Sequence, residues 1–381
     1  FFQAEDGIRD SVASRGLGDV YKRQVYTLVW LMVLVFFGTI AQRDVGLYAS
    51  QMKYFSSYYF LVAELIPLPG GRLTLMFMTL NLASSLFNKN LWKMKKLGLI
   101  IIHLGGLLLL VGGGITAQFS SEGNMIIKEV NQSEHVDDYH DMELVFVNTS
   151  MEDSLEYTVF DEPILKEGNT IEYDKLGISI DIISHLKNVS IQKRISSADT
   201  LYKGFLKDFI LLPKDPENEN TQNRPGLIVK MNGTGSKTDG IYGFFLGQKV
   251  PDTFNLDGHQ FFTEFRRKRT YIPFSIELLD FKKILHPGTG IAKSFSSEIN
   301  LIEKEIPRRV LIQMNEPLRH RGYTFFQASF IEGLDKEATV LAVVKNYGRL
   351  FPYISSIIMS VGLFLHLLVN LPKMIKRAPK Q

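Results

Sequence analysis

Two histidines of this sequence lie in segments that are otherwise apolar. His103 lies in the run LGLIIIHLGGLLLLVGGG at residues 97–114, and His366 lies in the run GLFLHLLVN. An imidazole among such residues is expected to stay neutral, because a charged side chain at mid-bilayer costs on the order of 2.5–3.5 kcal/mol. A neutral imidazole has one donor and one acceptor nitrogen. It can bond a neighbouring helix or ligate a metal such as haem iron, and residue chemistry alone favours the interhelical bond.

Four segments are apolar and long enough, or nearly long enough, to cross a membrane as helices. They are residues 25–41, 73–87, 97–117 and 351–371. The third is apolar all round, unlike the amphipathic helices of soluble proteins. The second is short and contains Asn81, and a re-entrant segment there would make the number of crossings odd.

Lysine and arginine predict the orientation, since short cytoplasmic loops carry an excess of both. Residues 88–96 contain four lysines, and the tail 372–381 contains three lysines and one arginine. Both segments are predicted to be cytoplasmic. The loop 42–72 and the large segment 118–350 are then predicted to lie on the outer side.

The segment 118–350 has the short β-prone runs of an all-β domain. GISIDII, at residues 177–183, alternates apolar and polar side chains, and several further runs follow at close spacing. This spacing predicts a sandwich or open barrel, with a helical turn or two near residues 197–212. The polar run LLPKDPENENTQNRPG, at 211–226, predicts a loop. The aromatic-rich run at 322–330 is expected to be mostly core, with a partner-binding surface as the alternative.

The predicted fold class is therefore an α-helical integral membrane protein with four transmembrane helices. A large β-rich, sandwich-like extracytoplasmic domain lies between helices 3 and 4. Residues 1–24, FFQAEDGIRDSVASRGLGDVYKRQ, resemble translated sequencing-adaptor read-through. We expect them to be an artefact that replaces the natural N-terminus, and they are left out of the fold prediction. The alternative is a polar cytoplasmic tail.

Composition excludes several functions. The 381 residues contain no cysteine, so this chain performs no disulfide, zinc–thiolate or thiol-exchange chemistry. A net charge of +3 gives no electrostatic footprint for nucleic acid. No catalytic residues and no metal ligands other than a haem ligand are predicted, because the remaining histidines lack ligand spacing: His135, His140, His185, His259, His286 and His320.

Three motifs together are specific to one family. PLPGG at 67–71, IIHLGG at 101–106 and EPLRHRGYTFFQ at 316–327 occur within longer matching stretches over residues 25–371. In these motifs the chain resembles the ResB/CcsB family of cytochrome c biogenesis proteins. The resemblance implies that His103 occupies the family's transmembrane haem-ligand position. Haem b would be bound there transiently and shared with a CcsA/ResC-like partner, and His366 is a secondary candidate.

The resemblance also implies a function in System II cytochrome c-type biogenesis. Such proteins lie in the bacterial inner (cytoplasmic) membrane, export haem and attach it to apocytochrome c together with the partner. The partner contributes a tryptophan-rich loop, whereas this chain has two tryptophans. It thus resembles the ResB half alone, or the N-terminal part of a fusion. We expect no enzyme in this chain by itself, and at most a subunit of a holocytochrome c synthase (haem lyase). The alternative is a membrane scaffold that binds no haem and docks the partner or the apocytochrome.

Overall fold

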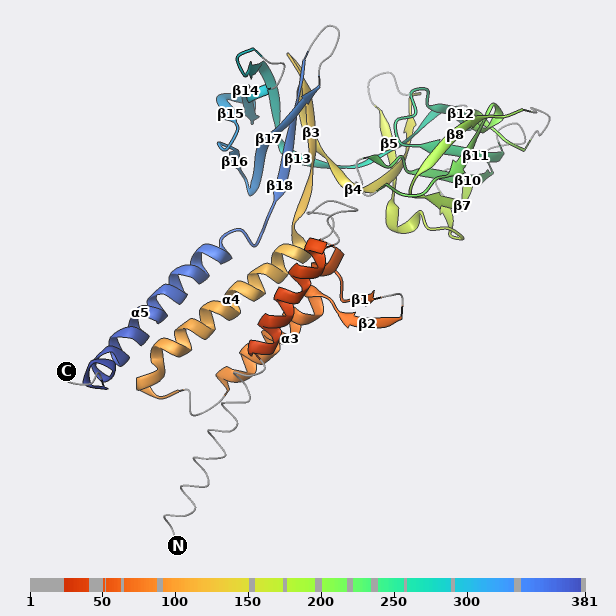
Figure 1. Ribbon diagram of the computed structural model, residues 1–381. Helices are drawn as coiled ribbons and strands as arrows, with labels where there is room; N and C mark the ends of the chain where they lie inside the picture. Colours follow the sequence, from red (N-terminus) through yellow and green to blue (C-terminus); the bar gives the residue numbers. More distant parts are fainter. Residues whose placement is uncertain are drawn as a thin grey trace. The chain divides into compact units, whose positions relative to one another are not determined.

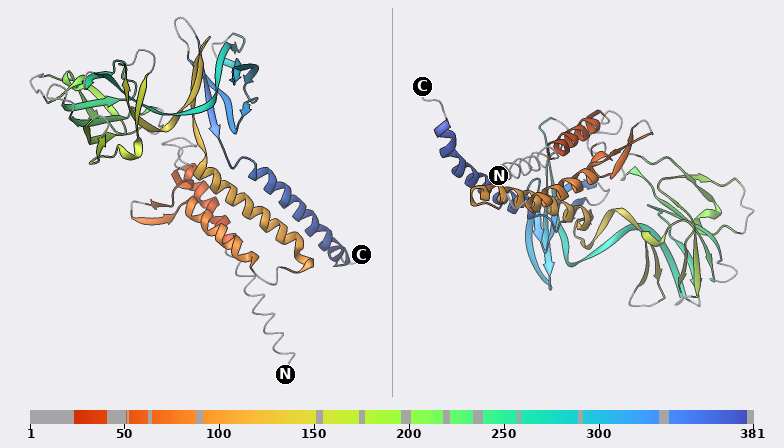
Figure 2. Two further views of the ribbon diagram at one scale, coloured as in Figure 1. Left: turned by 180° about the vertical axis from the view of Figure 1, so that it is seen from behind. Right: turned by 90° about the horizontal axis from the view of Figure 1, so that it is seen from below.

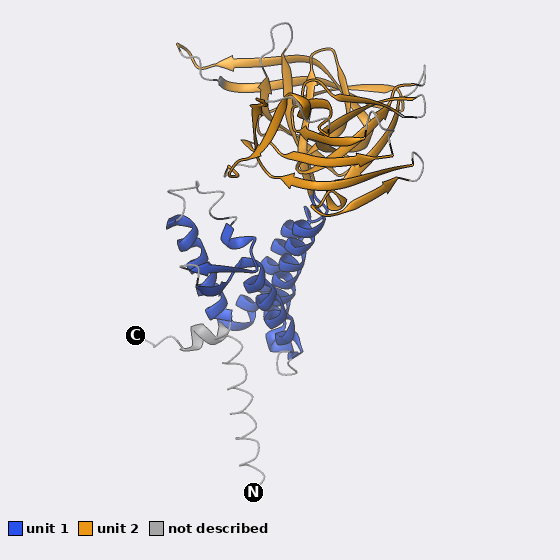
Figure 3. Cartoon of the chain, turned by 90° about the vertical axis from the view of Figure 1, so that its right-hand side faces the viewer, with its two compact units in different colours: residues 1–120, 346–381 blue, residues 121–345 orange. Residues whose placement is uncertain are grey.

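The computed structural model describes residues 24–40, 51, 53–62, 65–87, 92–150, 155–173, 177–195, 201–217, 222–233, 239–256, 259–288, 292–331 and 337–377. The chain divides into two compact units, one of residues 1–120 and 346–381 and one of residues 121–345 (Figure 3). Nearly all of the expected artefact at 1–24 lies outside the described residues. Parts of the predicted loops and tail, at 41–50, 88–91 and 378–381, lie outside them as well.

The first unit is helical. It contains a helix at Gln24–Ile40, α3 (Gly71–Leu86), the short η1 (Met94–Lys96), α4 (Leu97–Phe119) and α5 (Phe351–Arg377), with a hairpin of β1 (Tyr59–Val62) and β2 (Ile66–Pro69) (Figure 1). Each segment predicted to span a membrane thus coincides with a helix. Among the described helices, α4 and α5 are long and apolar enough to cross, while Gln24–Ile40 is shorter and α3 has 16 residues. The helix lengths support two crossings, and the four-span arrangement stays a prediction.

Glycines at intervals of seven residues allow α4 to lie close against α5 (Figure 1 and Figure 2). A Cβ atom at Gly98 would lie 2.5 Å from the backbone nitrogen of His366, and one at Gly105 would lie 3.1 Å from the carbonyl oxygen of Ser355. Gly112 continues the same row against the start of α5. Because small side chains permit close helix approach, this row determines which side of α4 faces α5.

The second unit, residues 121–345, is called the β unit below. It is built from antiparallel strands, which confirms the predicted β-rich domain. Its main sheet has ten strands, in the order β15-β14-β13-β4-β3-β18-β17-β16, with β12 paired to β13 and β5 paired to β4. A four-stranded sheet has the order β11-β10-β7-β6, and β8 pairs with β9. The helical turn predicted near 197–212 is the 3-10 helix η3. The bounds are β3 (Ser121–Lys128), β4 (Gln132–Asn148), β5 (Glu156–Asp161), η2 (Glu162–Ile164), β6 (Thr170–Tyr173), β7 (Ile178–Leu186), β8 (Val189–Lys193), η3 (Gly204–Lys207), β9 (Phe209–Pro213), β10 (Gly226–Asn232), β11 (Gly240–Phe245), β12 (Asp252–Leu256), β13 (His259–Leu285), β14 (Ala292–Glu303), β15 (Ile306–Gln313), β16 (Leu318–His320), β17 (Tyr323–Ile331) and β18 (Ala338–Lys345).

Two long strands, β4 and β13, contribute to two separate hydrophobic cores (Figure 1). One core lies between the four-stranded sheet and the paired segments of β4 and β13, with Phe146 and Phe244 fully buried. The other lies inside the rest of the ten-stranded sheet, where β17 contacts β14 and β15. We name these parts the sandwich lobe (138–268) and the curled lobe (121–137 and 269–345).

The boundary between the lobes is a shift in the pairing register of β4 and β13, between Arg267 and Arg269. Charged side chains are paired beside it. Arg266 Nε donates to Glu143 Oε1 at 2.7 Å, and both side chains are almost fully buried. Arg269 lies 3.3 Å from Asp137 across the same two strands. Since a buried charge is costly when its partner is absent, the Arg266–Glu143 pair favours this register over a slipped one.

Candidate functional site

His103 lies early in α4, and its residue is 8% exposed. Its ring Nδ1 lies 2.8 Å from the carbonyl oxygen of Leu99, one helical turn earlier. A carbonyl can only accept, so Nδ1 carries a proton, and in a neutral ring Nε2 then keeps its lone pair. A hydrogen bond from one ring nitrogen that fixes this tautomer is typical of metal-ligating histidines. A neutral His103 would thus have Nε2 available to a metal such as haem iron.

His103 faces away from α5. Five residues separate it from Gly98, which corresponds to a rotation of roughly 140° at 3.6 residues per turn. Gly106 lies on the His103 side, and a Cβ atom there would lie 3.3 Å from Leu82 Cδ2 of α3. Further along the same side, nothing among the described residues lies within 4 Å of a Cβ atom at Gly114. One glycine, Gly106, thus lies within a turn of the imidazole on this side of α4, and Gly114 lies about three turns further along.

His366 has a different environment. It lies on the side of α5 that contacts α4, next to Gly98. Its two ring nitrogens lie 3.1 and 3.4 Å from Asn370 Nδ2, and the same amide also donates to the His366 carbonyl at 3.0 Å. The structure therefore places the two histidines on different sides of α4 and does not bring them together. Among the residues that the structure describes, no carbonyl accepts a bond from the His366 ring to fix its tautomer.

Two histidines of the β unit, His320 and His135, make local contacts. His320 Nε2 lies 3.2 Å from Glu303, and its ring packs edge-on against Phe274 with centroids 4.8 Å apart. His135 lies 3.9 Å from Asp137, and burial lowers the pKa of its imidazole. Neither arrangement resembles the buried, carbonyl-bonded imidazole of α4.

The motif at 316–327 contributes to the core of the curled lobe. Tyr323 and Phe325 are buried, whereas Phe326 is 41% exposed. Gln327 Oε1 accepts from Ser297 Oγ at 2.6 Å, and its Nε2 donates to Thr339 Oγ1 at 3.0 Å. These bonds connect β14, β17 and β18, so most of the motif acts in packing, as expected for its aromatic residues.

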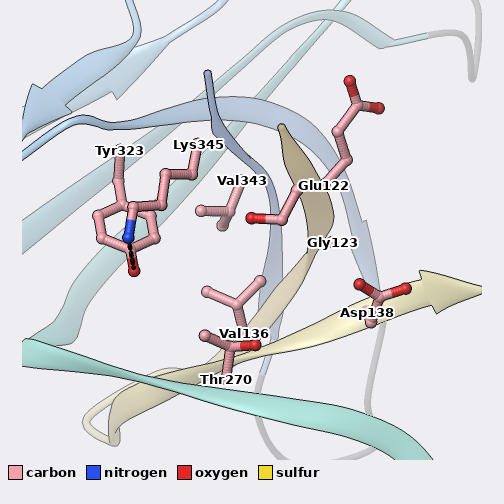
Figure 4. A pocket seen from close by; sticks show the side chains of 9 residues that line it. Glu122, Gly123, Val136, Asp138, Thr270, Tyr323, Val343 and Lys345 are labelled. Atoms are coloured by element: carbon pink, nitrogen blue, oxygen red, sulfur yellow. Dashed lines mark hydrogen bonds between the residues drawn. The ribbon is translucent and has the colours of Figure 1, made fainter. Parts of the chain in front are cut away.

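A small cavity in the curled lobe is lined by Tyr323 of this motif together with Glu122, Thr270 and Lys345 (Figure 4). Lys345 Nζ donates to the Tyr323 hydroxyl at 3.3 Å and lies 4.8 Å from the centre of the ring. The cavity volume is about 20 Å³. This is space for a single water molecule, so the cavity does not provide a site for an organic ligand.

Two comparisons with known proteins show what the chain is similar to. Residues 247–337, from the turn after β11 to just after β17, match the ResB-like family. The chain is also 28% identical over 99 residues to Protein NrfI of Wolinella succinogenes, covering 26% of this chain and 11% of the relative. The chain thus matches about a tenth of that relative's length. These matches confirm the resemblance to ResB/CcsB-like proteins, and His103 lies outside the segment matched by the family.

Proposed function

We propose that this chain is a membrane subunit of a cytochrome c biogenesis complex. In this role it exports haem and presents it for ligation to apocytochrome c, together with a CcsA/ResC-like partner in the bacterial inner membrane. The ResB-like match of residues 247–337 supports the general role in cytochrome c biogenesis. Two helices of membrane-crossing length and apolarity support the membrane setting. The large β unit would then lie on the outer side.

The proposal that this chain binds haem rests on one observation, the hydrogen bond from His103 Nδ1 to the Leu99 carbonyl. It leaves Nε2 as a neutral, buried donor to iron. This chain has no thiol, so the thioether bonds to haem would form on cysteines of the apocytochrome. The contribution of this chain is then to hold and orient haem b, with the second axial ligand supplied by the partner.

The test compares His103→Ala with His366→Ala in the purified membrane complex. Absorbance spectra measure bound haem, and cytochrome c maturation is followed in cells. We expect His103→Ala to lose most of the haem and to block maturation, with added imidazole restoring part of both. We expect His366→Ala to retain haem. Because a side-chain hydrogen bond within the membrane averages only about 0.6 kcal/mol, the His103→Ala chain should still insert and melt nearly normally.

Two results would change the assignment. Full haem content in His103→Ala with loss in His366→Ala would place the ligand on α5. Normal maturation with no haem absorbance in the wild-type complex would favour the scaffold function, in which the chain only docks the partner or the apocytochrome.

A further inference from the structure

The described ends of the polar loop after β9, residues 214–217 and 222–225, are joined by two buried asparagines. Asn188 Nδ2 donates to the carbonyl of Asp215 at 3.0 Å, and its Oδ1 accepts the backbone N–H of Arg224 at 3.1 Å. Asn223 Oδ1 accepts the backbone N–H of Glu217 at 2.7 Å, and its Nδ2 donates to the carbonyl of Glu217 at 3.1 Å. These four bonds hold the two described ends of the loop together, so they form one wall of fixed conformation.

This wall borders a cleft in the sandwich lobe with a volume of about 480 Å³. The volume lies in the range of small-molecule sites. The other walls come from β4, β13, η2 and the end of β7. The lining side chains that carry charge, or gain it on protonation, are Lys187, Arg267, His140, His185, Glu162 and Glu217.

The two carboxylates of the cleft already have partners. Glu162 Oε2 accepts the backbone N–H of Met142 at 2.7 Å, and Glu217 Oε1 pairs with Lys214 Nζ at 2.6 Å. In the described part of the chain, neither Lys187 nor Arg267 forms an ion pair with a carboxylate. Neither cation is therefore in direct contact with a carboxylate of the cleft, although Glu162 and Asp138 attract Arg267 at longer range.

Arg267, which lines the cleft, is held by hydrogen bonds at one of its guanidinium nitrogens. Its Nη1 donates to the backbone carbonyls of Tyr139 at 2.7 Å and His140 at 3.4 Å, which fixes the half-buried guanidinium against β4. Its Nε and Nη2 have no acceptor among the described residues. Guanidinium groups bind carboxylate and phosphate through two parallel N–H donors, and a group already held in place loses less side-chain freedom on binding.

We propose that this cleft binds a small organic anion bearing a carboxylate or a phosphate, with Arg267 as the principal contact and Lys187 as a second cation. The site is separate from His103 and does not depend on haem binding. It would give the β unit a ligand of its own.

The test is calorimetric titration of the full-length protein in detergent, at constant ionic strength. Citrate is the carboxylate probe and inorganic phosphate the phosphate probe. We expect at least one to bind, with Arg267→Gln weakening it by about 10-fold or more and Lys187→Gln by a few-fold. Arg267→Lys, which keeps the charge and loses the fork, should be intermediate. Lys293→Gln, an exposed cation of the curled lobe, is the matched control and should bind normally.

Thermal melts of each variant accompany the titrations. If Arg267→Gln melts early because its bonds to β4 are lost, Lys187→Gln decides, since Lys187 is exposed and its replacement leaves the fold intact. Binding of citrate alone identifies a carboxylate site, and binding of phosphate alone a phosphate site. The proposal is wrong if neither probe binds, or if Lys187→Gln and Arg267→Gln bind as tightly as Lys293→Gln.

Discussion

Asp252, the first residue of β12, is a buried carboxylate whose ionisation should destabilise the sandwich lobe. It is 8% exposed. Its Oδ1 accepts the backbone N–H of Phe205 in η3 at 2.8 Å, while Oδ2 is buried with no hydrogen-bond partner among the described residues. Gly204, in the left-handed region at φ +53°, lies against the carboxyl group, where a Cβ atom would collide with it. Burial raises the pKa of Asp252 to about 6.

The size and sign of the effect follow from linkage. Raising the pKa from 3.8 to about 6 corresponds to about 3 kcal/mol, at about 1.4 kcal/mol for each tenfold change in proton affinity. The folded chain binds this proton more tightly than the unfolded chain does. The stabilisation from the proton on Asp252 is therefore fully present below about pH 4 and is lost as the pH rises through about 6. Above that pH, Asp252 no longer makes the free energy of unfolding vary with pH.

The perturbation is Asp252→Asn, which keeps an acceptor for the Phe205 N–H but cannot ionise. The free energy of unfolding of both proteins is measured between pH 3 and pH 8 by circular dichroism of the β unit. The stability of wild type relative to Asp252→Asn should fall by about 3 kcal/mol over this range. Asp280→Asn is the control, because Asp280 is half-exposed and pairs with Lys282 at 2.9 Å. A difference between wild type and Asp252→Asn that does not vary with pH would refute the reasoning.

Three further predictions address the helices, the lobe boundary and the topology. Gly98→Ala should lower the melting temperature, because its methyl group would clash with the α5 backbone at a cost of about 1–3 kcal/mol in the free energy of unfolding. Gly113→Ala should leave the melting temperature unchanged, because no described atom lies within 4 Å of a Cβ atom there. Glu143→Gln should lower the free energy of unfolding by about 1–3 kcal/mol, because Arg266 keeps a neutral acceptor there and its ion pair with Glu264 at 2.9 Å. Glu264→Gln, on a 39% exposed side chain, should cost at most about 1 kcal/mol. A single cysteine at Lys95, in this cysteine-free chain, should resist an impermeant thiol reagent in intact cells; labelling there would reverse the predicted orientation.

Local sequence pattern was sufficient for the helices and for several strands. Apolar runs predicted helices at 25–41, 73–87, 97–117 and 351–371, and helices are found at Gln24–Ile40, Gly71–Leu86, Leu97–Phe119 and Phe351–Arg377. The fourth helix, α5, continues past the predicted end at residue 371 to Arg377, because polar residues can extend a helix beyond its apolar run. The alternation in GISIDII likewise predicted a strand in the region of β7.

The long strands were not predictable in the same way. β4 and β13 have 17 and 27 residues and pair with each other, although more than a hundred positions separate them. Their pairing depends on contacts with two different cores and on the Arg266–Glu143 pair, which no local pattern reveals. The division of the β unit into a sandwich lobe and a curled lobe therefore required the structure.

The two candidate sites differ in how far the sequence alone predicts them. His103 could be recognised from the sequence because a polar side chain in an apolar run is costly and needs a reason. The seven-residue spacing of Gly98, Gly105 and Gly112 also contained the information on which side of α4 faces a neighbouring helix. The anion-binding cleft gave no such signal, since Lys187 and Arg267 are brought together only by the packing of β7 against β13 and β4.

The family match and the haem-ligand assignment rest on different parts of the chain. The matched segment, 247–337, includes most of the curled lobe, where Phe325 and Gln327 act in packing and in a buried hydrogen-bond network. It therefore reports the architecture of the β unit. His103 lies in α4, outside that segment, and its assignment depends on its burial and its bond to Leu99. A chain that kept this β unit and lost the imidazole would still match the family, so haem binding is decided by the absorbance of the wild-type complex and of its His103 variants.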